Sequence, residues 1–246
     1  MCSNYRPVTR IDRLLTFFGV ERARDDPPQD IFPLGLAPFI RLRRGGPLQD
    51  ADGRIVEDGI FGLLPHFASE VAYGRKTYNA RSETVAVLAS FRQAWHAGRR
   101  CIVPAEYFYE PNWESGKAVR WRIGQAGDVP MGIAGIHAAW RHPDGREMST
   151  FAMLTVNADE HPLMRRFHRP GEEKRMVVIL HPDDYAEWLS CAVADAPKFF
   201  RQWQGPLDAA PEPPPPRAPG AASARTTRPQ PPPATPEEGP SGRLFE

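Results

Sequence analysis

The residue with the most unusual chemistry in this chain is the second one, Cys2. A small residue at position 2 permits removal of Met1, after which a free α-amine and a thiol belong to the same residue. The ordinary pKa values are about 8 for the amine and about 8.5 for the thiol, so both are partly unprotonated near neutral pH. Such a 1,2-aminothiol can add twice to one aldehyde and close a five-membered thiazolidine ring. The alternative is an inert residue near the N-terminus.

Two titratable side chains that suit proton transfer stand in unusual surroundings. Glu110 closes the aromatic run Glu106–Glu110, and an acid among aromatic rings can have a raised pKa that suits general acid–base work. His168 lies among four arginines, and a histidine there can donate or accept a proton beside a phosphate; the arginines are Arg165, Arg166, Arg169 and Arg175. The alternatives are a surface acid at a strand end and a loop histidine.

A phosphate-binding segment is indicated at Asn79–Glu83. It stands at the entrance to a helix that the apolar spacing predicts over Ser82–His96. Backbone donors at a helix N-terminus, together with Arg81, can hold a phosphate. Ser82 also suits the N-cap of that helix, so the segment has a structural role in either case.

Other familiar catalytic and cofactor motifs are missing from the sequence. It has no dinucleotide-binding GxGxxG, no P-loop, no HExxH and no GxSxG. The seven histidines form no metal-ligand pair at i, i+4 spacing, and the three cysteines form no CxxC. We therefore expect no metal, no organic cofactor, no disulfide framework and a reducing compartment.

The elements that must position these residues are mostly short strands. Alternating or continuous apolar runs predict strands at 38–42, 54–64, 101–103, 107–109, 119–123, 131–140, 149–156 and 175–180. Helices are predicted at 12–20, 82–96, from Pro182 onward and at 197–203. Many strands with few helices indicate an α+β fold with a curved mixed or antiparallel sheet, or a barrel-like core, and a few peripheral helices.

Proline divides the chain into two parts. Of 28 prolines, 13 lie in residues 205–246, where runs such as Pro213–Pro216 favour extended conformation and cannot supply a core. We expect a domain over residues 1–204 and a disordered Pro-rich tail over 205–246. The end of the tail, Leu244-Phe245, loosely resembles bacterial sliding-clamp-binding peptides, which allows a weak clamp or replisome contact.

The charge and hydropathy of the chain exclude several classes of protein. The formal net charge is +1, which argues against a protein that coats a polyanion broadly. The apolar run Leu14–Val20 is too short for a membrane span and lacks a signal-peptide cleavage site. We expect a cytoplasmic monomer without a membrane partner.

Several of these segments in combination resemble the SOS-response-associated peptidase family, the abasic-site-processing proteins that crosslink to DNA. The segments are Met1-Cys2, Phe61–His66, TYNARSETV at Thr77–Val85, RRCIVPAEYFYEPNW at Arg99–Trp113 and FHRPGEEKRMVVIL at Phe167–Leu180. The resemblance covers residues 2 to about 200 and leaves out the tail. It implies the family's fold with a DNA-binding cleft.

The resemblance also implies roles for individual residues. Cys2 matches the N-terminal nucleophile, Asn79 the residue that orients it, Glu110 the catalytic acid–base and His168 the proton shuttle. For DNA binding, the resemblance and the surrounding sequence point to Arg81, Phe67, Pro65, Arg165, Arg166 and Arg169. The chain departs from the family pattern where Ser3-Asn4 follow the cysteine, where Phe61 and Phe67 replace tryptophans, and where Glu106 and Tyr107 replace small residues and are expected to narrow the cleft.

The resemblance implies a sensor of abasic sites in single-stranded DNA that acts in the DNA damage response. Cys2 would form a thiazolidine with the ring-opened sugar after Met1 is removed, with autoproteolysis as one route, and weak lyase activity would accompany it. Such a protein would join the nucleoid when bound to damaged DNA. Two alternatives remain open: an N-terminal-nucleophile cysteine peptidase that acts on proteins, and a non-catalytic single-stranded DNA-binding module.

Overall fold

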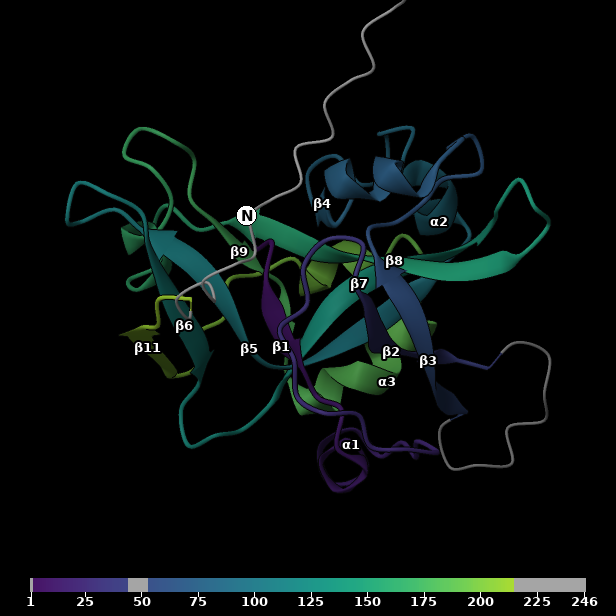
Figure 1. Ribbon diagram of the computed structural model, residues 1–246, viewed down its shortest axis with the longest axis horizontal. Coiled ribbons are helices and arrows are strands. Elements are labelled where there is room, and N and C mark those ends of the chain that lie inside the picture. Colours follow the sequence, from purple (N-terminus) through teal and green to yellow (C-terminus); the bar gives the residue numbers. More distant parts are fainter. Residues whose placement is uncertain (1, 44–52, 215–246) are drawn as a thin grey trace, which may run out of the picture. The chain divides into compact units, whose positions relative to one another are not determined.

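Five strands close into a ring at the centre of the fold (Figure 1). The computed structural model describes residues 2–43 and 53–214. The ring runs β5–β7–β8–β3–β2 and returns to β5, and all of its pairings are antiparallel except β3 with β8. Its strands are β2 (Leu36–Leu42), β3 (Arg54–Phe61), β5 (Arg100–Asn112), β7 (Met131–Arg141) and β8 (Glu147–Asn157). The predicted α+β fold with a barrel-like core is confirmed.

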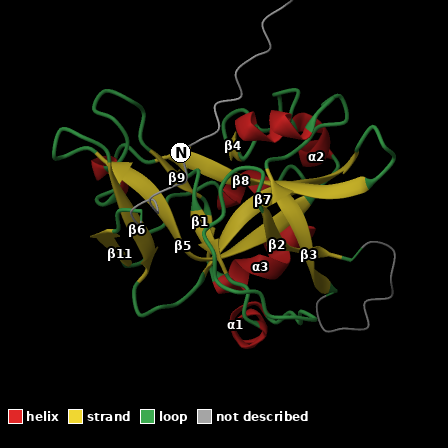
Figure 2. Cartoon of the chain, viewed as in Figure 1, coloured by secondary structure: helices red, strands yellow, loops and turns green. Residues whose placement is uncertain are grey.

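Shorter strands extend the ring at its edges. These are β1 (Tyr5–Pro7) on β5, β4 (Asn79–Arg81) and β9 (Arg175–Val177) on β8, β10 (Ile179–Leu180) on β7, and β6 (Val119–Gln125), which pairs with β5 on one side and with β11 (Leu207–Pro211) on the other. The helices lie around the strands (Figure 2). They are α1 (Ile11–Phe18), α2 (Arg92–His96) and α3 (Tyr185–Ser190), with 3₁₀ turns at Val71–Lys76, Met164–Arg166, Pro182–Asp184 and Ala196–Phe199.

The ring is filled by aromatic and branched side chains. Phe61 stacks on Phe151 with ring centroids 5.5 Å apart, and Phe39 contacts Phe151 at the same distance. Outside the ring, Trp188 of α3 is fully buried and donates its indole N–H to the Cys101 carbonyl of β5 at 2.8 Å. The burial of large rings on both sides of β5 makes that strand the centre of the core.

β5 is one continuous strand of 13 residues, where the sequence predicted two short ones. Pro104 and Pro111 lie within it, and proline normally weakens a strand because it has no N–H to donate. Their carbonyls are used instead: Pro104 accepts from the backbone of Val8 at 3.0 Å, and Pro111 accepts from His168 at 2.9 Å. The prolines therefore dock other segments without ending the strand.

The helix predicted over Ser82–His96 is wrong for most of its length. Regular helix is confined to α2, and residues 82–91 form successive turns. The predicted apolar face was Val85, Leu88, Ala89, Phe91 and Trp95, but Leu88 and Ala89 are exposed in the structure. Since only part of that face meets the core, packing does not stabilise a long helix here.

Contacts with neighbouring strands hold the start of this segment in another conformation. The Ser82 backbone N–H donates to the Thr155 carbonyl at 2.9 Å, which continues the pairing of β4 with β8. Glu83 then forms a bidentate ion pair with Arg175. Ser82 therefore extends a strand instead of capping a helix.

The predicted boundary after residue 204 does not coincide with the division seen in the structure. Leu207–Pro211 forms β11 and pairs with β6 in register from Leu207↔Gln125 to Pro211↔Trp121, and the compact unit runs to Pro213. Glu212 adds a hydrogen bond from the Tyr109 hydroxyl at 2.7 Å. Proline is tolerated here because β11 is an edge strand. The expectations for residues 215–246, including the clamp contact, lie outside the described residues.

No helix in the described ranges has both the length and the apolar character that a membrane crossing requires.

Truncated chains can test whether the folded unit ends after Gln204 or after Pro213. A chain that ends after Pro213 is expected to keep the melting temperature of the full chain, because β11 is intact. A chain that ends after Gln204 loses β11 and leaves the β6 edge unpaired, and we expect its melting temperature to fall by roughly 5–10 °C. Differential scanning calorimetry measures both, and equal melting temperatures would show that β11 adds nothing to stability.

Candidate active site

The pairing of β1 with β5 determines where the N-terminal segment lies. Tyr5 is opposite Phe108 in antiparallel register, and the Tyr109 backbone N–H donates to the Asn4 carbonyl at 2.9 Å. The Asn4 side chain donates to the Ile31 carbonyl at 3.1 Å, so the segment is held from both sides. Cys2 is consequently buried beside the end of β5, with 1% of its surface exposed.

Asn79 contacts the main chain of Cys2. Its side-chain amide donates to the Cys2 carbonyl at 2.8 Å, while no hydrogen-bond partner of its Oδ1 occurs among the described residues. β4 carries Asn79 and pairs in parallel with β8, opposite Met153. The resulting geometry orients residue 2 and leaves a buried acceptor beside it.

The approach to β4 requires a glycine. Gly62 has φ +139°, and a Cβ there would lie 2.5 Å from the Gly74 carbonyl oxygen. Only glycine lets these two backbones approach so closely. Because Leu63 then donates to the Thr77 carbonyl, this close approach sets the path of the chain into Asn79.

Glu110 and His168 form a buried pair. His168 Nε2 lies 2.9 Å from a Glu110 carboxylate oxygen, and the two residues are 7% and 2% exposed. His168 has φ +62°, a left-handed conformation that costs a non-glycine residue of order 1–3 kcal/mol. Its backbone N–H is held by Pro111, and the preceding Phe167 bridges to Asn112. The end of β5 therefore supplies Glu110 and also fixes the loop that carries its partner.

The charges around Cys2 favour a neutral thiol at rest. Burial raises the pKa of the Cys2 thiol far above its usual range, and the Glu110 carboxylate raises it further. Tyr78, half-buried beside the same groups, has a raised pKa through burial first and then through Cys2 and Glu110. Tyr78 was not among the residues predicted from the sequence, although it directly precedes Asn79 in the motif that carried the resemblance.

The structure thus brings together all four residues predicted for catalysis: Cys2, Asn79, Glu110 and His168. Their catalytic roles stay predictions. The expected narrowing by Glu106 and Tyr107 is not supported: Glu106 pairs with Arg13 of α1, and Tyr107 lies between Arg6 and Arg122. Both side chains contact residues outside the four-residue cluster.

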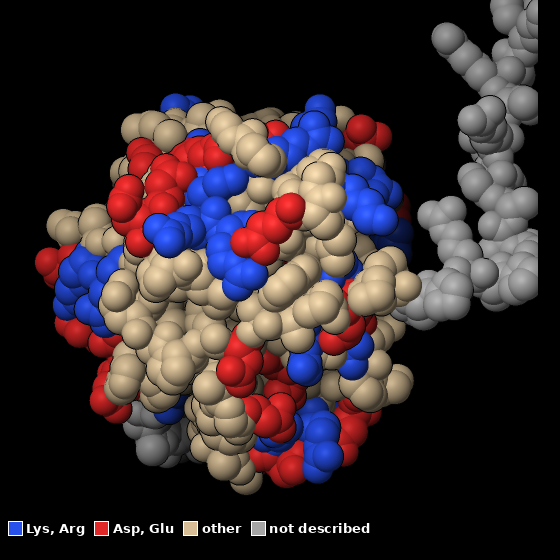
Figure 3. Space-filling view, turned by 90° about the vertical axis from the view of Figure 1, so that its left-hand side faces the viewer, with Lys and Arg blue, Asp and Glu red and all other residues tan. Residues whose placement is uncertain are grey.

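The residues predicted to bind DNA are more dispersed. A groove of about 690 Å³ leads to His168 and has Arg165, Arg166, Trp113 and Lys174 among its lining residues. Arg166 is paired with Glu114 at 2.9 Å. Arg169 lies near the groove, and its guanidinium carbon is 4.9 Å from the centre of the Trp113 ring. Seen from the side of β6 and β11, basic side chains alternate with acidic ones (Figure 3). On this face positive and negative charge are therefore interspersed, in line with the near-neutral composition.

The other three predicted DNA contacts lie on the segments that lead to and include β4. Arg81 is about half exposed and pairs with Glu173. Phe67 is 48% exposed and packs edge-on against His66 and Tyr73, so its ring is accessible. Pro65 is buried, and its carbonyl accepts from Ala68 in the turn below Phe67.

Within the described ranges, no group of three or more His, Cys, Asp or Glu side chains could hold a metal ion.

Comparison with known proteins identifies the family. The model of the SOS response associated peptidase (SRAP) family matches residues 1–210. The chain belongs to this family. It is 32% identical to the abasic site processing protein YoqW of Bacillus subtilis over 150 residues, and the match covers 61% of this chain and 63% of YoqW. It is 29% identical to the abasic site processing protein HMCES of Gallus gallus over 182 residues, covering 62% of this chain and 51% of HMCES. The chain therefore spans less than two thirds of either SRAP relative.

Solved structures share the fold of this chain. A crystal structure of a protein from Bordetella bronchiseptica is 37% identical, with a TM-score of 0.77 over 86% of this chain and 99% of that one. A crystal structure from Bacteroides thetaiotaomicron has a TM-score of 0.69 at 21% identity, over 85% of this chain and 90% of that one, and supports the fold alone.

The pKa of the Cys2 thiol should depend on Glu110. In Glu110→Gln the negative charge beside the thiol is gone, so the pKa should fall and alkylation of Cys2 should begin at lower pH than in the wild type. Mass spectrometry of the N-terminal peptide after iodoacetamide treatment across a pH series measures the midpoint. Glu106→Gln on the same strand is the control and should leave the midpoint unchanged. An unchanged or higher midpoint in Glu110→Gln would contradict the assignment.

Proposed function

We propose that this chain processes abasic sites in single-stranded DNA by forming a covalent crosslink through Cys2. The observation that carries the proposal is the convergence of Asn79, Glu110 and His168 on residue 2, in a SRAP family member whose curated relatives are named abasic site processing proteins. The substrate is the ring-opened aldehyde of a baseless deoxyribose. Such a protein would act in the response to DNA damage.

The first step is attack by an amine. Hydrolysis of the Met1–Cys2 peptide bond frees the α-amine of Cys2, whose nitrogen then adds to C1′ of the aldehyde. Glu110 accepts the ammonium proton, and the carbonyl oxygen leaves as water to give a Schiff base. The amine acts first because burial and Glu110 keep the thiol protonated.

The second step closes the ring. The Cys2 sulfur adds to C1′ of the Schiff base, and the thiol proton passes to the nitrogen, so aldehyde and aminothiol become thiazolidine plus one water. His168, 2.9 Å from Glu110, relays protons during sugar opening, closure and reversal. Asn79 holds residue 2 in position, and such positioning raises the effective concentration of the reacting groups. A Schiff base at C1′ also permits β-elimination, which gives weak lyase activity.

The arginines and Phe67 bind the strand around this centre. Arg81, Arg165, Arg166 and Arg169 contact the sugar–phosphate backbone without reading sequence. Phe67 offers an accessible ring on which a base can stack, which favours single strands over intact duplex.

An adduct assay tests the proposal. The purified protein, incubated with a single-stranded oligonucleotide that carries one abasic site, should give a band that resists denaturation. Cys2→Ser should abolish the stable adduct, whereas Cys191→Ser, a half-buried cysteine outside the site, should form it normally. Intact mass should show loss of Met1. No adduct, an adduct that persists in Cys2→Ser, or peptide cleavage without DNA would argue for one of the alternatives.

Reversal of the crosslink should depend on His168. His168→Ala removes the proton relay, and we expect release of the adduct to slow by about 100-fold or more, the scale of general acid–base catalysis. His181→Ala, an exposed histidine near α3, is the control. The measurement follows transfer of the protein to an excess of competitor abasic DNA, and an unchanged release rate would refute this role.

A further inference from the structure

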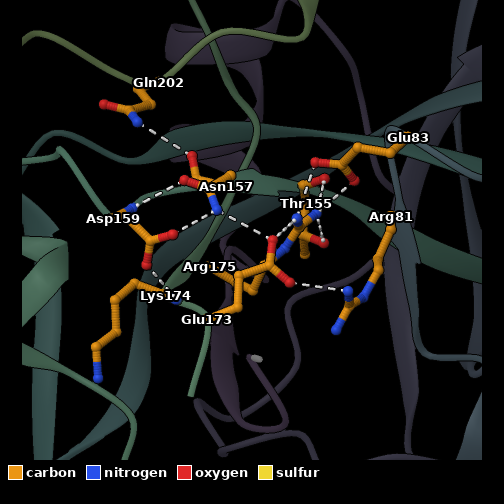
Figure 4. Close-up of polar contacts among 9 residues, drawn as sticks. All are labelled: Arg81, Glu83, Thr155, Asn157, Asp159, Glu173, Lys174, Arg175 and Gln202. Atoms are coloured by element: carbon orange, nitrogen blue, oxygen red, sulfur yellow. Dashed lines mark hydrogen bonds and ion pairs between the residues drawn. The ribbon is translucent and has the colours of Figure 1, made fainter. Parts of the chain in front are cut away.

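A carboxylate occupies the position where a phosphate would suit the surrounding donors (Figure 4). One oxygen of Glu173 accepts from Arg175 at 2.7 Å and from the Asn157 amide at 3.1 Å, and the other accepts from Arg81 at 2.8 Å. Two guanidinium groups and an amide thus converge on one pair of oxygens. Because two non-bridging oxygens of a phosphodiester present the same kind of acceptor pair, these donors also suit a DNA backbone.

Arg175 stays in place without Glu173. It is 2% exposed, forms a bidentate ion pair with Glu83 at 2.8 and 2.9 Å, and donates to the Thr155 carbonyl at 2.8 Å. Arg81 differs, because it is about half exposed and Glu173 is the carboxylate paired with it among the described residues. Loss of Glu173 would therefore free the Arg81 side chain, whereas Arg175 would still be held by Glu83 and Thr155.

The backbone beside Glu173 is anchored while its side chain reaches solvent. The Lys174 N–H donates to Asp159 at 2.8 Å, and the Lys174 carbonyl accepts from Ala158 at 2.7 Å, which fixes the start of β9 on β8. The Glu173 side chain is 35% exposed. It can rotate outward without any movement of the strand.

The three donors around Glu173 are Arg81, Asn157 and Arg175, here called the cradle. The cradle is close to the candidate active site along one strand. Arg81 follows Asn79 by two residues in β4, so both project from the same face, about 6–7 Å apart along the strand. We infer that Glu173 is an internal competitor for a backbone phosphate of the bound strand, and that the strand displaces it from Arg81 when it binds. This inference rests on the proposed function. Hydrogen bonds from Arg175 and Asn157 lower the pKa of Glu173, so the competing carboxylate is charged at neutral pH.

Glu172 offers a matched control. It is the preceding residue, carries the same charge, is exposed and forms no ion pair among the described residues. Fluorescence anisotropy with an undamaged single-stranded oligonucleotide compares Glu173→Gln with Glu172→Gln across a salt series. We expect Glu173→Gln to bind about two- to five-fold more tightly than the control, the scale of an exposed ion pair. The slope of log K against log salt should steepen by up to about 0.7, the share of one phosphate in a single strand.

A second background tests the mechanism. In Arg81→Ala the gain from Glu173→Gln should disappear, because the arginine that it releases is absent. Equal affinities of the two glutamine variants, weaker binding by Glu173→Gln, or a gain that persists without Arg81 would each overturn the inference.

The two proposals can fail separately. If the wild type crosslinks abasic DNA but Glu173→Gln gives no gain, the inference fails and the proposed function stands. If the wild type neither binds nor crosslinks DNA, the proposed function fails. Binding of inorganic phosphate then tests whether Glu173 competes with a phosphate for the cradle. Phosphate should then raise the melting temperature of Glu173→Gln more than that of Glu172→Gln, and equal shifts would overturn the inference.

Discussion

The antiparallel pairing of β1 with β5 is the interaction on which the site depends. Through it the N-terminal segment runs along a strand of the ring that α3 covers from outside, and residue 2 lies beside Glu110. The same strand holds the His168 loop through the Pro111 carbonyl. One strand therefore carries Glu110, supports the loop of His168 and aligns the segment that ends in Cys2.

Several features that cost free energy of folding lie together at this site. A carboxylate and a histidine are buried together, a thiol is desolvated beside them, and His168 adopts a left-handed backbone. Such features persist only where the surrounding structure holds them. Here β6 and the N-terminal segment do so, because the end of β5 that carries Glu110 is paired with β6 on one side and with β1 and the Asn4 carbonyl on the other.

Much of the fold follows from local sequence, and the exceptions have physical reasons. The strands of the ring were predictable because apolar runs mark them, and β7 and β8 bury most of their residues. The long helix was not, because Leu88 and Ala89 meet solvent, and β11 was hidden by proline-rich composition that an edge strand tolerates. The four clustered residues were found through motifs, whereas Glu173 depended on partners up to 92 positions away in sequence.

The contact between Asn79 and residue 2 goes to a main-chain carbonyl. A hydrogen bond of this kind is indifferent to the side chain at position 2, as are the backbone bonds that hold Asn4 and Tyr5. The framework therefore holds residue 2 mainly through its main chain, and the thiol adds one hydrogen bond, to the Asn4 carbonyl at 3.5 Å. A residue with oxygen or selenium in place of sulfur would keep the same main-chain alignment, so a substitution at position 2 exchanges the heteroatom without changing how the residue is held.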